Sequence, residues 1–369
     1  MNEIENLTIG IEEEYQIIDP KSRELTSFIS EFLDQGAILF RDQLQPELLQ
    51  SQVEVGSRVC KNIQDVTTEI KRLRNMICNL AQENDCSIIA AGTHPFSSWK
   101  NQVVTERDRY YGFVDSMQIV AKRLLIFGMH IHIGIDDRDL RIDIMNQMRY
   151  FMPHILAFST SSPFWRGENT GFKSYRSIVF EDLPRTGTPE YFDSASAYDQ
   201  YVDTLISSGC IDEPTKIWWD IRPHPKFPTL EFRICDCTTR VEDVIAIAAM
   251  VQALVGKLIE LRKKNMTWRP YRSGFIAENK WRAMKDGVQG KLIDFGKRAE
   301  SPISDLMEEL LDFVDDVVDQ LGSREEIENL GMILKSGSSA DRQLKRFEET
   351  GKMEDVVDML IEETMLGCG

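Results

Sequence analysis

Two alternating periodicities constrain the fold of this 369-residue chain more than any other feature of its sequence. Short stretches with apolar residues at every second position predict strands, and longer stretches with apolar residues three and four apart predict helices. The predicted strands span residues 7–18, 52–55, 87–93, 129–135, 217–222 and 229–235. The main predicted helices span residues 63–84, 140–159, 241–264 and 301–320, and from about residue 241 onward we expect only helices. The sequence therefore predicts an α+β fold.

The composition indicates which classes of binding partner the protein can have and in which cell compartment it is expected. The chain has 43 basic and 60 acidic residues, a formal net charge of −17, which argues against a nucleic-acid or anionic-membrane binder. We find neither a signal-peptide pattern at the start nor a run of about 18 uncharged apolar residues, so we expect a cytoplasmic protein. The seven cysteines are scattered without a CxxC pair, which favours reduced thiols.

The predicted strand 7–18 carries the first polar face. Alternation places Glu12 and Glu14 on one face of the strand and Glu13 on the other. Neighbouring like charges on one face are unfavourable unless a cation neutralises them, so the pair indicates a metal ion or a cationic ligand. A solvated acidic edge is the alternative. We expect no catalytic part for Glu13.

The segment MHIHIGI, residues 129–135, carries the second polar face, with His130 and His132 side by side. Imidazole binds divalent metals and also donates hydrogen bonds to phosphate or carboxylate groups. Hydrogen-bonded core histidines are the alternative. The spacing differs from the helical HExxH of metalloproteases, where the histidine ligands lie four residues apart. His94, before a turn-forming proline, fits a hydrogen-bonded turn residue and a ligand equally well, whereas we interpret His154 and His224 as structural.

The segment TLEFRIC, residues 229–235, carries a third polar face with Glu231 and Arg233. Alone, such a pair is typical of a surface ion pair of little energetic value. Taken together, the strands supply five candidate hard-metal ligands, Glu12, Glu14, Glu54, His130 and Glu231, and two candidate anion binders, Arg222 and Arg233. Carboxylate-rich sites with one imidazole suit Mg²⁺ or Mn²⁺ holding nucleotide phosphates, whereas Zn²⁺ sites favour cysteine and histidine.

Two further segments lack clean periodicity. Residues 163–189 contain several glycine, proline and arginine residues, and we interpret them as an active-site loop, with a lid as a hypothesis. The stretch KSGSSA, residues 335–340, predicts a flexible connection between C-terminal helices.

Seven motifs carry a family resemblance. They are GIEEE (10–14), QSQVEV (50–55), AGTHPFSSW (91–99), GMHIHIG (128–134), SPFWRGENTGFKSYR (162–176), WDIRPHP (219–225) and LEFRICD (230–236). In this order they resemble the YbdK-type carboxylate-amine ligases, the second family of glutamate-cysteine ligases and relatives of glutamine synthetase. The resemblance covers roughly residues 7–260, and the helical C-terminal third matches no motif.

The resemblance implies a glutamine synthetase-like catalytic fold. We then expect a curved, mainly antiparallel sheet whose concave face holds ATP and two or three Mg²⁺ ions, with helices on its convex side. The expected organisation is a single catalytic domain over residues 1–369, with a sheet-bearing core at about 7–260 and a helical part at about 261–369. A homodimer is an expectation of the same kind.

Residue roles also follow from the resemblance. It implies that Glu12, His130 and Glu231 hold the metal that bridges the ATP phosphates, and that Glu14 and Glu54 hold a second metal. His132 would contact substrate or phosphate, and Arg233 would bind the transferred phosphoryl group. Substrate or phosphate binding is further implied for Arg166, Arg176 and Arg222.

The implied reaction joins a carboxylate to an amine. ATP phosphorylates the carboxylate, and the amine displaces phosphate from the acyl phosphate. The resemblance names glutamate as the expected donor and cysteine, or another small-molecule amine, as the acceptor. A guanidino or amino phosphotransferase remains an alternative, and so does a catalytically inactive ligand-binding relative, although the complete set of charged residues speaks against the latter.

Overall fold

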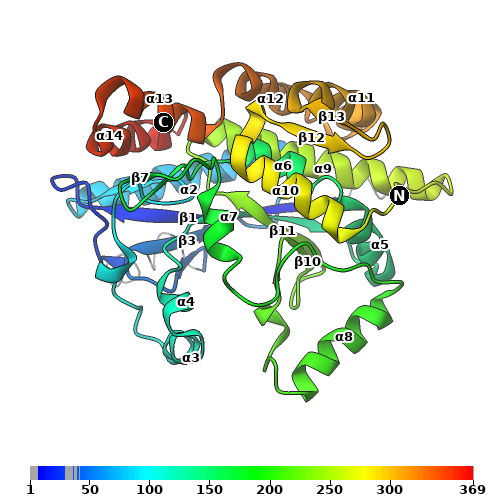
Figure 1. The fold of residues 1–369 in the computed structure, drawn as a ribbon, viewed down its shortest axis with the longest axis horizontal. Helices are drawn as coiled ribbons and strands as arrows, with labels where there is room; N and C mark the ends of the chain where they lie inside the picture. The colour runs from blue at the N-terminus through cyan, green and yellow to red at the C-terminus, as the bar shows by residue number, and fades with distance from the viewer. Residues whose placement is uncertain (1–6, 30–35, 37–39, 41, 369) are drawn as a thin grey trace.

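The computed structural model describes residues 7–29, 36, 40 and 42–368 (Figure 1). Its centre is a seven-stranded sheet in which all paired strands are antiparallel. The strands lie in the order β10 (Ile221–Pro223), β11 (Thr229–Asp236), β5 (Gly128–Gly134), β1 (Ile9–Ile18), β3 (Gln52–Gly56) and β2 (Leu44–Pro46), and β4 (Ser87–Ile89) pairs with the end of β1. The predicted α+β class is confirmed.

Helices cover one face of this sheet because the strands direct apolar side chains toward it. In β1 these side chains are Ile9, Ile11, Tyr15 and Ile17, all buried. Helices α2 (Ile63–Glu83), α6 (Met152–Ser159) and α9 (Val241–Lys263) contact the sheet, and α10 (Ser273–Asp286), α11 (Ile303–Leu321) and α12 (Arg324–Ser336) pack outside them. The polar side chains of the same strands project to the opposite face.

Helix α9 is apolar almost all round, as expected of a helix enclosed by others. Among the described residues it is the one helix whose length and composition would allow it to cross a membrane. Of its most apolar window, 83% is buried inside the protein, and a core helix has the same composition.

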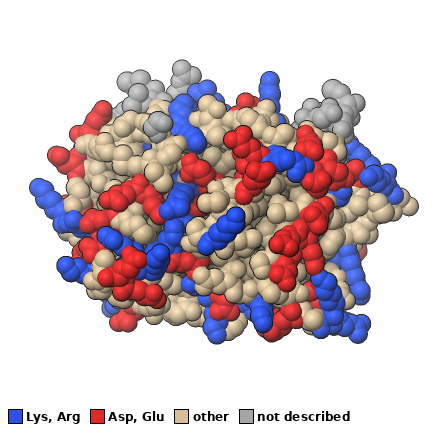
Figure 2. Space-filling model, turned by 90° about the horizontal axis from the view of Figure 1, so that it is seen from above, with Lys and Arg blue, Asp and Glu red and all other residues tan. Residues whose placement is uncertain are grey.

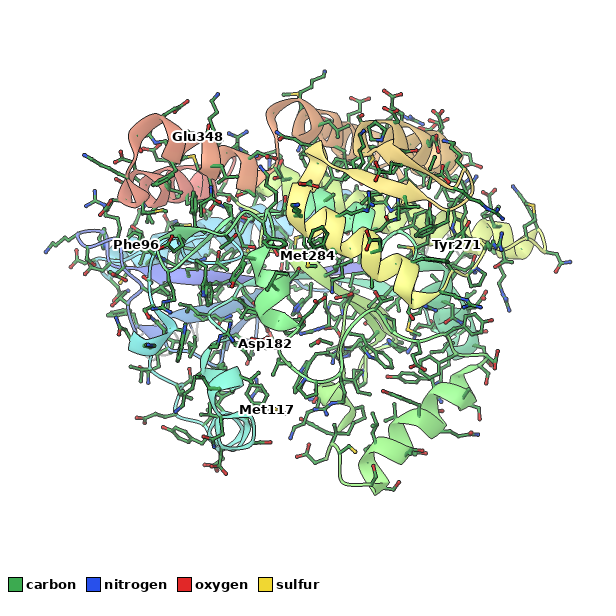
Figure 3. The ribbon with its side chains drawn as sticks, viewed as in Figure 1. Phe96, Met117, Asp182, Tyr271, Met284 and Glu348 are labelled. Atoms are coloured by element: carbon green, nitrogen blue, oxygen red, sulfur yellow. The ribbon has the colours of Figure 1, made fainter. Side chains whose placement is uncertain are left out.

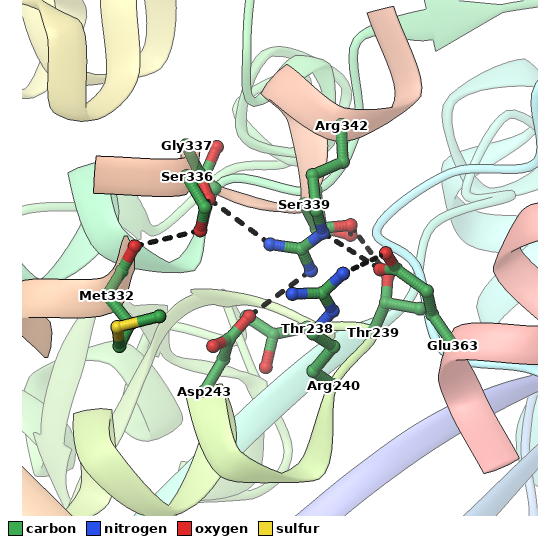
Figure 4. A network of polar contacts seen from close by, with 12 residues as sticks. Thr238, Thr239, Arg240, Asp243, Met332, Ser336, Gly337, Ser339, Arg342 and Glu363 are labelled. Atoms are coloured by element: carbon green, nitrogen blue, oxygen red, sulfur yellow. Dashed lines mark hydrogen bonds and ion pairs between the residues drawn. The ribbon is translucent and has the colours of Figure 1, made fainter. Parts of the chain in front are cut away.

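The C-terminal helices α13 (Ser339–Thr350) and α14 (Met353–Met365) pack at the β4 end of the sheet, where Val357 and Leu360 join a second apolar cluster with Ile18 and Ile89. Polar contacts fasten them to the start of α9 (Figure 4). Arg342 lies 3.2 Å from Asp243 and 2.8 Å from Glu363, which also pairs with Arg240 at 2.5 Å.

The connection predicted at residues 335–340 is shorter than expected, because only Gly337 and Ser338 lie between α12 and α13. Gly337 has a φ of +83°, a conformation that favours glycine. Ser338 then caps α13, with the Asp341 carboxylate accepting a hydrogen bond from the Ser338 backbone N–H at 2.8 Å.

Two appendages project from the polar side of the sheet, away from the helical layers (Figure 1). One contains α3 (Asp108–Met117) and α4 (Ile119–Lys122), and the other contains α8 (Ala195–Ser207). In Figure 3, Met117 and Asp182 lie on this side, whereas Glu348 lies on the side of the helices. Asp182 pairs with Arg123 at 2.8 Å and thereby links α4 to the segment after α7 (Tyr175–Phe180).

The predicted helix 140–159 is wrong as a single element. The structure has α5 (Arg138–Met148) and α6, separated by a turn. Pro153 lies in the first turn of α6. In a continuous helix its ring would clash with the carbonyl of Arg149, and it has no N–H to donate, so the chain restarts here instead.

The prediction that only helices follow residue 241 is also wrong. Strands β12 (Lys291–Asp294) and β13 (Ala299–Pro302) form a hairpin, and α11 begins after it at Ile303. The Asp294 carboxylate closes the turn by accepting the backbone N–H groups of Gly296 and Lys297 at 2.8 and 2.9 Å.

The segment 163–189 is ordered rather than irregular. It contains the β6 (Phe164–Trp165) and β7 (Glu168–Asn169) hairpin, helix α7, and β8 (Thr186–Gly187), which pairs in parallel with β9 (Trp218–Trp219). The buried Asp236 carboxylate fastens this segment to the sheet, because it accepts hydrogen bonds from the hydroxyls of Ser162 and Ser174 at 2.6 and 2.8 Å. The predicted strand 217–222 is likewise divided, into β9 and β10, at Asp220.

Candidate active site

The polar face of the sheet gathers acidic and imidazole side chains from neighbouring strands. Residues directly paired in antiparallel strands project to the same side. The register forms three such pairs, Glu12 with His130, Glu14 with Glu54, and Glu231 with His132. All five metal-ligand candidates named from the sequence therefore lie on one face.

The first cluster consists of Glu12, His132 and Glu231, whose ligand atoms all lie within 4.8 Å of one another. His132 Nε2 is 3.5 Å from one Glu12 oxygen, and His130 Nδ1 is 3.2 Å from the other. Burial would raise the pKa of Glu12, but hydrogen bonds to the two histidines outweigh it and hold the pKa well below the usual range. Glu12 is therefore a carboxylate shared between two imidazoles.

This grouping differs from the one that the sequence implied. His132, rather than His130, lies with Glu12 and Glu231, because the register of β5 against β11 places His132 opposite Glu231. His130 instead joins a second cluster, with Glu12 and Glu54.

A third cluster consists of Glu14, Glu47 and Glu54, and sequence reasoning missed Glu47. Burial and the nearby Glu14 raise the pKa of Glu47 to about 7. The pKa of Glu54 is raised well above its usual value by burial and by Glu12. Glu47 follows the short strand β2 in a stretch without clear alternation, so the only signal for it was its acidic side chain close to the QSQVEV motif.

These clusters fit divalent cations. Three carboxylates within 4.8 Å repel one another unless a cation lies between them. His130 Nε2 is buried and, within the described part of the chain, has no hydrogen-bond partner, whereas His132 Nε2 faces the Glu12 carboxylate at 3.5 Å. Buried polar atoms normally have partners, so the His130 nitrogen indicates a missing ligand. The oxygen-rich donor set with imidazole suits Mg²⁺ or Mn²⁺.

Glu231 is bound by two arginines. Arg222 contacts both its carboxylate oxygens, at 2.7 and 3.3 Å, and Arg233 contacts one of them at 2.5 Å. Burial would raise the pKa of Glu231, but Arg233 and Arg222 lower it well below its ordinary value. The carboxylate is therefore kept ionised in a buried position.

The two arginines differ in what they leave free. Arg222 Nη1 donates to the backbone carbonyls of Thr215 and Ile217 at 2.8 and 2.5 Å, so this buried guanidinium is fully engaged with protein groups. Its geometry suits orientation of Glu231 rather than capture of a substrate. Arg233 Nε is buried and has no partner among the described residues, which leaves this guanidinium donors for an anion.

The other two arginines named from the sequence lie outside the clusters. Arg176 is buried on the polar face at the Gly128 end of β5, where it donates to the carbonyls of Arg233 and Ile234 at 3.3 and 3.4 Å, and its Nε has no partner among the described residues. A Cβ at Gly128 would collide with it. Arg166 is exposed in the β6–β7 turn and lines a separate surface pocket of about 480 Å³ with residues such as Trp165.

A cavity of about 610 Å³ opens beside the first cluster, lined by Glu12 and His132 and by the less polar Gly10, Gly134 and Phe227. Gly10 and Gly134 lie on the same strand faces as the two ligand candidates; a Cβ at Gly10 would make only ordinary contacts, whereas the Thr8 hydroxyl occupies the space beside Gly134. The cavity therefore combines an apolar wall with a charged end.

Two of the remaining histidines have structural positions, and the third lies near the site. His94 bonds backbone groups in a turn, and His154 is buried among core residues. His224 is closer to the site than expected, with its ring centroid 5.4 Å from that of His132. Glu13 lies on the opposite face, as predicted, where it pairs with the buried Arg74.

Comparisons with known proteins agree with this geometry. The family model for glutamate-cysteine ligase family 2 matches residues 8–359. A protein of Roseiflexus castenholzii named "Putative glutamate--cysteine ligase 2" is 56% identical over 360 residues, covering 98% of this chain and 95% of that protein.

Solved structures share the fold at low sequence identity. A bifunctional glutathione synthetase from Pasteurella multocida aligns with a TM-score of 0.74 and 13% identity, over 99% of this chain and 53% of that chain. A glutamate-cysteine ligase from Francisella tularensis, in complex with AMP, aligns with a TM-score of 0.71 and 14% identity, over 98% of this chain and 89% of that one. The glutamine synthetase-like fold is confirmed, and the chain belongs to glutamate-cysteine ligase family 2.

Proposed function

We propose that this protein is an ATP-dependent carboxylate-amine ligase that activates the γ-carboxylate of glutamate as an acyl phosphate and joins it to an amine. The observation that carries the proposal is the convergence of three acidic and imidazole clusters with the open guanidinium of Arg233 on one face of the sheet. Such a face can neutralise a polyphosphate and align a phosphoryl acceptor, and the reaction needs no enzyme nucleophile.

The three clusters are the proposed Mg²⁺ positions, with Mn²⁺ as a substitute. The clusters of Glu12 with His132 and Glu231, and of Glu12 with His130 and Glu54, would hold metal at the phosphate end. The cluster of Glu14, Glu47 and Glu54 would hold it at the end nearer the amino acid. When bound, Mg²⁺ would neutralise phosphate charge.

Arg233 is the proposed contact for the transferred phosphoryl group. A guanidinium presents donors in a rigid fork that matches phosphoryl oxygens. Glu231 holds one side of this guanidinium at 2.5 Å, and Arg222 in turn fixes Glu231, so the fork is oriented before substrate arrives. This chain of contacts supplies alignment rather than proton transfer.

The cavity beside Glu12 is the proposed place for the nucleotide base and ribose. Its apolar wall suits a base, and its charged end leads to the first cluster. The Francisella tularensis relative in complex with AMP supports an adenine nucleotide as ligand.

Glutamate as donor and cysteine as acceptor are supported by the names of the family and of its members. The cytoplasm is the proposed compartment, since all seven cysteines are free thiols.

The test measures the ADP and the hydroxamate that form from ATP, Mg²⁺, glutamate and hydroxylamine. Two controls accompany it: the same reaction without glutamate, and the same reaction with the Glu231→Ala variant. We expect glutamate-dependent hydroxamate that the variant does not form. ADP without hydroxamate would favour a phosphotransferase instead. Formation of neither product would favour an inactive relative or another donor acid.

A further inference from the structure

Lys280 is a buried cation on α10, in the helical C-terminal third of the chain. It is 4% exposed. Its ammonium group contacts both oxygens of Asp220, at 2.8 and 2.9 Å, and one oxygen of Glu181, at 2.8 Å. Lys280 therefore joins α10 to the junction of β9 and β10 and to the end of α7.

Asp220 connects Lys280 to the backbone of Arg233. The Asp220 side chain is 3% exposed, and its backbone carbonyl accepts the N–H of Arg233 at 2.8 Å. The N–H of Asp220 itself donates to the carbonyl of Gly187 at 2.9 Å. Asp220, one of the two acidic residues that Lys280 contacts, is thus hydrogen-bonded directly to the peptide group of Arg233.

The backbone of Arg233 lies at an irregularity of the sheet, where its position depends on contacts besides regular strand pairing. The pairing of β11 with β5 shifts register between Phe232 and Cys235, where Arg233 lies. A bulge of this kind interrupts the ladder and re-aims a side chain. The Arg233 carbonyl also accepts a 3.3 Å hydrogen bond from the Arg176 guanidinium.

We propose that Lys280 is a positioning residue for Arg233, acting through Asp220 to hold the Arg233 guanidinium beside Glu231. The consequence for catalysis rests on the proposed function, whereas the effect on the Arg233 backbone does not. A buried ion pair is by itself weak evidence for stability, because apolar replacement of both partners is often neutral. Positioning therefore explains this pair better than stabilisation does.

The test compares Lys280→Met and the double variant Lys280→Met/Asp220→Leu with Arg342→Met. The double variant removes both charges and so leaves no buried ion unpaired, which protects its fold. Arg342 is the matched control, since it is also a largely enclosed ion-pair cation but contacts Asp243 on α9 and Glu363 on α14 (Figure 4).

The first readout is deuterium uptake in the peptide spanning residues 229–236, measured by mass spectrometry. We expect uptake at least tenfold faster in both Lys280 variants and unchanged in Arg342→Met. Unchanged uptake in the Lys280 variants, or an equal increase in Arg342→Met, would overturn the proposal. This readout holds even if the protein turns out not to ligate glutamate.

The second readout is steady-state turnover. Misplacing a reacting group by about 1 Å can cost about 10²-fold in rate. We expect kcat to fall by about that factor in the Lys280 variants, with KM for ATP within about threefold of wild type, because the metal clusters are untouched. Lys280→Arg, which keeps the charge, should recover part of kcat. A rise in KM with kcat unchanged would count against positioning.

Discussion

Glu47 is the residue whose substitution tests the third cluster most sharply. It lies with Glu14 and Glu54, and nothing else in the cluster replaces its oxygen. We expect Glu47→Gln to raise the Mg²⁺ concentration for half-maximal activity at least tenfold, and to lower kcat by about 10²-fold. Titration of ADP formation against Mg²⁺ measures both changes.

Glu83→Gln is the matched control for this substitution. Glu83 is exposed at the end of α2, so the same loss of charge there should leave the Mg²⁺ dependence unchanged. An Mg²⁺ titration of Glu47→Gln that superimposes on wild type would remove Glu47 from the proposed metal site.

His94 makes the stability of the fold depend on pH. Its Nδ1 accepts the N–H groups of Phe96 and Ser97 at 3.1 and 2.8 Å, and its Nε2 donates to the carbonyl of Arg23 at 2.9 Å. Protonation of Nδ1 would remove that acceptor. Burial lowers the pKa of His94 to about 3, below the ordinary value of about 6.5.

The sign of the pH effect follows from this difference. Below about pH 6.5 His94 is protonated in the unfolded chain, whereas in the folded protein it stays neutral down to about pH 3. The stabilisation present above pH 6.5 is therefore lost as the pH falls. Between pH 7.5 and 5.5, wild type should lose about 1.4 kcal/mol more unfolding free energy than His94→Gln. Urea unfolding at both pH values measures the difference, and equal losses would contradict it.

Sequence reasoning at this scale identified which side chains share a face and missed how they group. Strand alternation alone places Glu12, Glu14, His130 and His132 correctly, because the period of two is strict. The grouping of His132 with Glu231 depends on the register between β5 and β11, which no local pattern contains. Glu47 escaped notice for the same reason, since only tertiary folding brings it beside Glu54.

Among the elements, β1 and α2 are joined by a buried ion pair behind the site. Arg74 contacts both oxygens of Glu13 and donates to the carbonyls of Thr238 and Thr239 at 2.9 and 2.5 Å. Glu13→Gln would leave the Arg74 charge buried without a carboxylate, which typically costs about 3–5 kcal/mol. We expect a lower unfolding midpoint but near-normal turnover per folded molecule, since Glu13 faces away from the clusters.

Thermal unfolding together with active-site titration separates these two effects. The double variant Glu13→Leu/Arg74→Leu removes both charges and should regain most of the lost stability. If Glu13→Gln instead lost turnover while keeping the wild-type midpoint, Glu13 would have a catalytic part that its position does not explain.

The sequence predicted element boundaries correctly where the apolar periodicity was long. The predictions were wrong where a few residues interrupt that periodicity. The 21 residues of α2 match the predicted helix because apolar spacing and the Asn62 cap agree. The division at Pro153 and the β12–β13 hairpin each depend on a few residues inside a pattern that otherwise favours helix. Asp220 divides a predicted strand in the same way, and its burial against Lys280 comes from a helix 60 residues later in the chain.

At the scale of the whole molecule, the helical C-terminal third is bound to the sheet-bearing core at several places. Lys280 reaches Asp220, and Ser339 shares hydrogen bonds with Ser161 and Thr239. We therefore expect residues 1–369 to fold as one catalytic domain, rather than as a core that is stable without its C-terminal part.

A chain ending at Ser336 tests this expectation, because it lacks α13 and α14. Without them Ile18, Ile89 and Phe164 lose the apolar cover of the second cluster. Each fully buried side chain of this size contributes about 1.5–3 kcal/mol, and a typical total stability is only about 5–15 kcal/mol. We expect the shortened chain to aggregate or to unfold far below the wild-type midpoint. A chain ending at Met365 keeps both helices and should unfold in a single calorimetric transition with a midpoint near that of wild type. If the chain ending at Ser336 also unfolds in one transition at that midpoint, the single-domain expectation is wrong.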